Sequence, residues 1–330
     1  MITTVVLTGL AGILIGSADL PLGSVLAELV DFLPVVEVES GLSTREATIL
    51  WQIRLPRVVL AGTVGGMLAL AGAAFQGVFR NPLADPYLLG VAAGAGLGAT
   101  LAIAYVPTAS DGLISPLPLA AFGGAVLGVG ATYALSRSAR AAPAATLILA
   151  GVAVAAFLTA TQTFVQQQRS ETFREVYAWI FGALGTVGWG EVTLVLPYVV
   201  ISAGALIGYR RLLDVMAVGD EEAEAVGVVS SRVRLAVIAL ATLGTAAVVA
   251  VSGLIGFVGI IVPHAIRLAF GASYRTIIPL SIGFGASFLI LADLVARSVL
   301  APAELPIGVV TAFIGAPFFL IVLRNAKRST

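Results

Sequence analysis

The chain alternates between long apolar runs and short segments that collect charged residues, proline and glycine. The runs approach about 20 residues, the length that an α-helix needs to cross a hydrocarbon core of about 30 Å. We therefore predict an all-α, polytopic membrane protein of about ten transmembrane helices, forming a single transmembrane domain over residues 1–330. The predicted helices are Ile2–Gly16, Val58–Phe79, Leu88–Val106, Leu117–Leu135, Ala144–Val165, Val192–Tyr209, Leu235–Val251, Ile255–Phe270, Ile277–Val295 and Ile307–Leu323.

The basic residues predict how these helices are oriented. We interpret Met1–Gly16 as a retained first helix, because it lacks the basic start and the clear cleavage site of a signal peptide. Ten helices place both termini on one side, and basic residues favour the cytoplasm. Cytoplasmic termini leave twelve of the 18 basic residues inside, so this orientation is predicted. The six outside are Arg45, Arg54, Arg57, Arg169, Arg174 and Arg297.

Glycine is abundant, with 37 residues, and several glycines are spaced four apart. Lipid gives helices no hydrophobic reason to associate, so small residues that allow close backbone contact matter more. Such spacing predicts a tightly packed bundle. The pairs are Gly62/Gly66, Gly90/Gly94, Gly94/Gly98, Gly124/Gly128 and Gly204/Gly208.

Composition supports the membrane assignment and excludes several kinds of chemistry. The chain is 59% hydrophobic and 11% charged, against about 25% charged in soluble domains. Its net charge is zero, which gives no support for a nucleic-acid partner. There is no cysteine and one histidine, His264, so neither a thiolate nor a histidine metal site is expected. We expect no cofactor in this chain.

The position of the single lysine indicates whether the chain could bind ATP through a P-loop. A P-loop needs GxxxxGK[ST], in which lysine contacts the phosphates, whereas Lys327 follows Asn325-Ala326. The chain therefore does not bind ATP in that manner and is not expected to be an enzyme. If ATP drives transport, a partner must supply the ATPase.

Four segments depart from the apolar pattern. Trp51–Arg57 places two arginines around a proline, and either an interfacial anchor or a dock for an external partner would suit it. Phe79–Pro86 contains two prolines with Asn and Asp, which predicts a tight connection, either an ordinary turn or a gate. Leu213–Val229 predicts one or two short cytoplasmic helices, with acids near a helix start and Gly227 as a C-cap. A docking surface for a soluble subunit and a solvated linker are the two interpretations of this third segment.

The fourth segment is Gly256–Arg267, taken with Asp293 and Arg297. Pro263 is a candidate break in its helix, and His264 is either a proton-relay group or a packing residue. Asp293 is the only acid inside a predicted span, and Arg297 lies four residues on, so the two can pair on one helix face.

These segments, in this order, resemble the FecCD-type ABC permeases, which import iron–siderophore chelates, heme and vitamin B12. The resemblance covers Trp51 to Arg324. It implies a homodimer around a central pore in the cytoplasmic membrane, two ABC ATPase subunits that bind ATP and Mg, and an extracytoplasmic substrate-binding protein. It also implies a cobalt- or iron-containing chelate as substrate and transport by alternating access. The motifs that carry it are Arg54–Arg57, Gly72–Pro86, Gly256–Arg267 and Ala303–Pro317.

The resemblance also implies residue roles. Three arginines match positions that meet acidic residues of the binding protein: Arg54, Arg57 and Arg297. An inner gate loop is matched by Asn81, Pro82 and Leu83. A second gate falls on Ala144 and Ala145, where vitamin B12 permeases carry small hydroxyl residues, so a steric gate is expected there. Coupling helices on the ATPase are matched within residues 212–231 by Asp214, Gly219, Asp220, Glu221, Glu222, Glu224, Ala225 and Gly227.

Trp51–Arg57 and Glu304–Ala312 look most like the vitamin B12 permease, which favours that substrate over a ferric siderophore or heme. Two other classes stay open. An ion-coupled secondary transporter needs ionisable groups near the midplane, and here only Asp293 qualifies, toward one end. A non-transporting membrane scaffold is the other.

Overall fold

The computed structural model describes residues 1–16, 20–31, 40–106, 115–137, 143–185 and 188–326, and the regular secondary structure in this part is all helical. Each of the ten apolar runs forms a helix. These helices are α1 Ile2–Leu14, α4 Leu55–Phe79, α5 Val91–Tyr105, α6 Pro116–Arg137, α7 Pro143–Gln168, α9 Trp189–Val218, α11 Ser230–Ser252, α12 Val258–Phe270, α13 Tyr274–Ser298 and α14 Ile307–Ala326.

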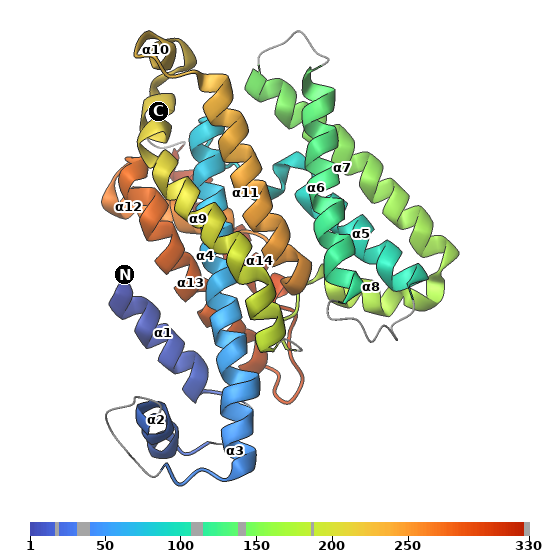
Figure 1. The fold of residues 1–330 in the computed structure, drawn as a ribbon, viewed down its shortest axis with the longest axis vertical. Coiled ribbons are helices and arrows are strands. Elements are labelled where there is room, and N and C mark those ends of the chain that lie inside the picture. The colour runs from blue at the N-terminus through green and yellow to red at the C-terminus, as the bar shows by residue number, and fades with distance from the viewer. Residues whose placement is uncertain (17–19, 32–39, 107–114, 138–142, 186–187, 327–330) are drawn as a thin grey trace.

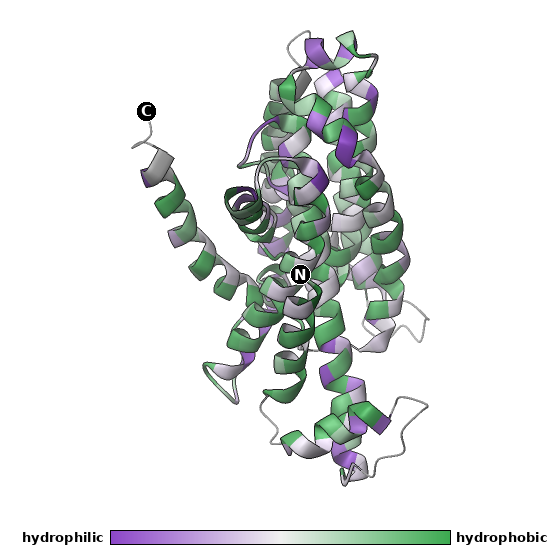
Figure 2. Ribbon diagram, turned by 90° about the vertical axis from the view of Figure 1, so that its left-hand side faces the viewer, coloured by the Kyte–Doolittle hydropathy of each residue, from purple (hydrophilic) through white to green (hydrophobic). Residues whose placement is uncertain are grey.

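Among the described residues, six helical segments are long and apolar enough to cross a membrane. Helices α1, α5, α12 and α14 offer shorter apolar stretches, so the count of ten spans stays a prediction. Hydrophilic residues gather toward the two ends of the molecule (Figure 2), one end carrying α2 and α3 and the other carrying α10. We call these the α2 end and the α10 end.

Helix α4 forms the centre of the bundle (Figure 1). It is apolar all round and nearly every residue from Pro56 to Phe79 is buried, as expected for a helix with no polar face. Helices α9, α11, α12 and α13 pack around it, whereas α5, α6 and α7 pack on one another and meet this group through α6 and α11.

Several glycine contacts confirm close packing. A Cβ on Gly94 would overlap the carbonyl oxygen of Gly124, and one on Gly98 would overlap that of Ala120, so α5 and α6 touch through their backbones. The pair Gly204/Gly208 does not serve this purpose within the chain, because a Cβ on either meets nothing within 4 Å.

The structure adds short helices outside the apolar runs: α2 Leu22–Asp31, α3 Thr44–Thr48, the π-helix Ile49–Arg54, the 3₁₀ turns Pro86–Leu89 and Ser170–Thr172, α8 Phe173–Ile180 and α10 Asp220–Ala225. The central helix consequently continues from Thr44 to Phe79. Ser43 and Glu46 begin it with a capping box. The π turn precedes Pro56, and Leu55 N–H bonds to the Leu50 carbonyl five residues back.

Pro263 does not break its helix, contrary to the expectation from sequence. Helix α12 runs through it, and the carbonyl of Gly259, which the proline ring cannot bond, accepts a hydrogen bond from Gln76 Nε2 at 3.2 Å. A neighbouring side chain thus replaces the lost backbone bond, and it joins α12 to the end of α4.

Candidate functional site

Five charged residues meet where α1, α4 and α13 come together toward the α2 end. We call Arg54, Arg57, Asp293, Arg297 and Glu304 the arginine cluster. Arg57 lies at its centre: its Nη2 is 2.8 Å from Asp293 Oδ1, and its Nη1 is 2.8 Å from Glu304 Oε1. The Asp293 side chain is 3% exposed and that of Glu304 is 43% exposed. One carboxylate therefore holds Arg57 from inside and the other from the surface.

The other two arginines bond to the end of α1. Arg54 donates to the carbonyl oxygen of Ile13 at 2.9 Å, and Arg297 donates to that of Gly12. The last carbonyls of a helix have no partner within it and carry its negative dipole end, which suits a guanidinium. The arginines thereby fix short helix α1 against α4 and α13.

The predicted pair between Asp293 and Arg297 is confirmed, with Arg297 Nε 3.5 Å from Asp293 Oδ2. The Asp293 carboxylate is thus paired with two arginines, Arg57 and Arg297. Glu304 lies in the loop between α13 and α14, where the hydrogen bond from Arg57 lowers its pKa below the usual range. These surroundings favour the ionised form of Glu304 at neutral pH.

The structure brings Arg54, Arg57 and Arg297 together, as the docking interpretation requires, yet it buries them. Each is less than 8% exposed, and each is bonded within the chain. They are not free surface cations here, and the exposed member of the cluster is Glu304. Their role toward a binding protein stays a prediction.

The predicted gate loop is a tight turn after α4. Asn81 Oδ1 accepts a bond from Leu83 N–H at 2.9 Å, and its carbonyl accepts one from Ala84 N–H at 3.0 Å. Pro82 is exposed. The loop ends on Asp85, which caps the 3₁₀ turn through Tyr87 N–H, and Tyr87 Oη donates to the carbonyl of Ile255. The non-helical connection is confirmed, and gating by it stays untested.

The second predicted gate position is at the start of α7. Ala144 and Ala145 fall in its first turn, where Ala145 is exposed and the side chain of Ala144 lies outside the described part. Nothing in this geometry tests a steric gate.

The predicted coupling segment holds one separate helix. Residues up to Val218 belong to α9, and α10 follows over Asp220–Ala225. Gly227, at φ +83°, ends it, and its N–H bonds to the carbonyl of Glu224, so the glycine C-cap is confirmed. Gly219 joins the two helices in an extended conformation.

The acidic residues of this segment divide into two sets. Asp214 accepts bonds from Ser273 Oγ and Tyr274 N–H, and Asp220 pairs with Arg234 at 2.9 Å, so both face the bundle. The outward set is exposed together with apolar side chains, Val218 at 72% and Val226 at 68%. Exposed apolar patches of this kind mark interaction sites. The outward polar and small residues are Glu221, Glu222, Glu224, Ala225 and Gly227.

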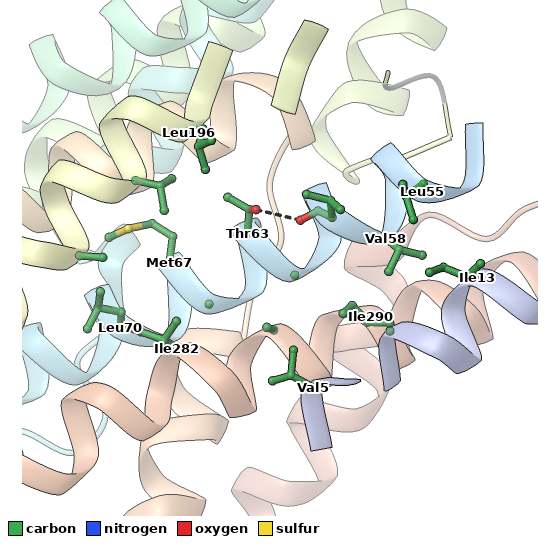
Figure 3. Close-up of a pocket in the computed structure, with 17 residues that line it drawn as sticks. Val5, Ile13, Leu55, Val58, Thr63, Met67, Leu70, Leu196, Ile282 and Ile290 are labelled. Carbon is green, nitrogen blue, oxygen red and sulfur yellow. Dashed lines mark hydrogen bonds between the residues drawn. The ribbon is translucent and has the colours of Figure 1, made fainter. Parts of the chain in front are cut away.

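A cavity of about 470 Å³ lies between α1, α4, α9 and α13 (Figure 3). Its wall is apolar, and the hydroxyl of Thr63 is turned back onto the Val59 carbonyl at 2.8 Å. The lining provides no group for acid–base or metal chemistry.

Comparison with known proteins decides the family. Residues 4–325 match the FecCD transport family. The chain belongs to this family. It is 41% identical over 290 residues to the cobalamin import system permease protein BtuC of Halobacterium salinarum, covering 88% of this chain and 77% of that one. The hemin transport system permease protein HmuU of Yersinia pestis is 38% identical, covering 84% and 83%.

A solved structure supports the same assignment. A metal-chelate type ABC transporter in an inward-facing conformation superposes with a TM-score of 0.84 at 29% identity, covering 98% of this chain and 97% of that one. The protein is therefore a FecCD-family ABC importer permease, a multi-pass protein of the cell membrane and not itself an enzyme. In this FecCD permease His264 packs edge-on against Phe318 with ring centroids 6.0 Å apart, as the packing interpretation expects. In the described residues no group of three or more His, Asp or Glu side chains could hold a metal.

Proposed function

We propose that this permease imports vitamin B12 across the cytoplasmic membrane by alternating access, driven by a partner ABC ATPase. The observation that carries the substrate is the 41% identity to a permease named for cobalamin import. Ferric siderophores and heme are the second candidate, because permeases named for ferric citrate and hemin are 35% and 38% identical.

The proposed assembly is a homodimer with both termini in the cytoplasm. Each of the two ATPases contacts the exposed face of α10 in one protomer, where apolar Val218 and Val226 lie beside three glutamates. The path for so large a chelate is mostly apolar and weakly selective, so selectivity lies in the binding protein. An ion-coupled mechanism is less well supported, since Asp293 is engaged by Arg57 and Arg297.

A binding assay on the cognate binding protein tests the substrate. Titration calorimetry with cobalamin, a ferric siderophore and heme should give the tightest binding for cobalamin. If heme or the siderophore binds more tightly and cobalamin does not bind, the substrate assignment is wrong and the importer assignment stands.

We also propose that the binding protein docks at the arginine cluster, with one of its carboxylates replacing Glu304 on Arg57. The partial exposure of Glu304 makes this exchange feasible, whereas Asp293 is too buried to leave. Arg57→Glu should weaken docking and Glu304→Gln should strengthen it, as measured by surface plasmon resonance on the permease in nanodiscs. Arg174→Glu, which reverses an exposed arginine of α8, is the control. Equal affinities for all three variants would contradict docking here.

A further inference from the structure

Arg80 is the residue at which the central helix ends, and its backbone is unusual. It adopts φ 50° and ψ 35°, the left-handed conformation, which costs a side-chain-bearing residue about 1–2 kcal/mol relative to glycine. Its N–H bonds back to Gly77, and Asn81 N–H bonds to the Gln76 carbonyl, closing the helix as a Schellman motif with arginine at the glycine position.

The helix is held firmly just before this point. Gln76 is 1% exposed and bonds through Nε2 to the Gly259 carbonyl and through Oε1 to Arg267. Helices α4 and α12 are thus tied one turn before Arg80. A displacement of the gate loop that leaves this tie intact would begin at Arg80, and we call Arg80 the hinge for this reason.

The side chain of Arg80 reaches α10. Its Nη2 lies 3.5 Å from Asp220 Oδ2, and Asp220 is the first residue of α10. The same carboxylate receives Arg234 Nη2 at 3.0 and 2.9 Å on its two oxygens. The Arg234 side chain is 5% exposed, so Asp220 is needed there to balance a nearly buried charge.

We propose that Asp220 is the positioning residue through which α10 sets the gate loop, acting on the hinge at Arg80. The contact itself is of little value to stability, because both partners are about one-third exposed. The contact acts through geometry. Arg234 holds the Asp220 carboxylate in place, and the Arg80 side chain moves with that carboxylate. A shift of α10 thereby changes the position of Arg80, the residue directly before the gate loop. The transport role of this contact rests on the proposed function, whereas the contact itself is independent of that function.

The first test needs no partner protein. The chain has no cysteine, so spin labels on Leu83→Cys and Val226→Cys report the distance between the gate loop and the end of α10. We expect a narrow component from the two labels within one chain, which Asp220→Asn broadens or shifts and Arg232→Gln, in an exposed arginine of α11, leaves unchanged. An unchanged distribution in Asp220→Asn would overturn the proposal, whatever the protein transports.

The second test distinguishes the side-chain contact of Arg80 from its left-handed backbone conformation. Arg80→Gly keeps the left-handed turn but removes the guanidinium, so thermal stability should not fall. In proteoliposomes with the ATPase and binding protein, substrate imported per ATP hydrolysed should fall roughly tenfold, within the usual range of coupling energies. Arg80→Lys should restore most of that ratio. A ratio in Arg80→Gly equal to wild type would contradict the proposal, whereas no ATP-driven uptake by the wild type would contradict the proposed function instead.

Discussion

At the scale of single residues, Asp293 has the largest consequence for the arginine cluster. It is buried and contacts Arg57 and Arg297 together. Removing one partner of a buried ion pair leaves an uncompensated charge and costs about 3–5 kcal/mol. We therefore expect Asp293→Ala to lower the free energy of unfolding by an amount in this range.

Glu304 offers the matched comparison, because it binds the same arginine from a half-exposed position. Glu304→Gln should cost less than about 1 kcal/mol. Urea unfolding of both variants in the same detergent measures the difference. If the two variants lose similar free energies of unfolding, burial of the carboxylate does not determine how much each ion pair of the cluster contributes to stability.

The pH dependence of the Glu304 contact follows from its lowered pKa. The folded pKa is below the unfolded value of about 4.3, so the stabilisation is complete above that value. It is lost as pH falls through the lowered folded pKa. The melting temperatures of wild type and Glu304→Gln should therefore differ by a constant amount above about pH 5 and converge toward pH 3. A gap that widens on acidification would contradict this assignment.

At the scale of elements, α5 and α6 are joined by backbone contact. A Cβ on Gly94 would overlap the Gly124 carbonyl, and one on Gly124 would overlap that of Gly94. We expect Gly94→Leu to separate the two helices and to lower the yield of monodisperse protein on size exclusion. Gly204→Leu makes the same chemical change where a Cβ meets nothing within 4 Å, so it should be tolerated. Equal loss in both would mean that close packing is not the cause.

The apolar runs predict the helices well, because a span must satisfy its backbone within itself and therefore needs a long apolar sequence. Helices α2, α3 and α8 lie outside the apolar runs, are short and carry charges, so no such constraint marks them in the sequence. Proline is common in the first turn of a helix, so Pro56 suggests that a helix begins there. The helix in fact continues through Pro56, because the preceding π turn pairs the backbone N–H of Leu55 with the carbonyl five residues back.

The candidate site is predictable only where its contacts are local. The pair Asp293 and Arg297 is four residues apart, and helical spacing reveals it. Arg57 meets Asp293 and Glu304 across 236 and 247 residues of chain, and no local pattern carries such pairing. For the same reason the sequence suggests that Arg54, Arg57 and Arg297 are exposed at the protein surface, whereas tertiary contacts bury their side chains.

At the scale of the whole molecule, the central helix connects two charged regions. The arginine cluster lies near its beginning, and the pair of Arg80 with Asp220 lies at its end. The continuous helical segment runs from Thr44 to Phe79, and its part between the two regions, residues 58–79, carries no charged residue. This arrangement fits a permease that receives a partner at one end and is driven from the other.

The claim that most needs testing is that transport by this chain is powered by ATP on a partner subunit. The measurement is uptake of labelled cobalamin into proteoliposomes that contain the permease, its ATPase and its loaded binding protein. We predict uptake with ATP and the wild-type ATPase, and none with an ATPase variant that binds but does not hydrolyse ATP. Uptake that persists with the hydrolysis-deficient ATPase, or that an ion gradient alone sustains, would contradict the account.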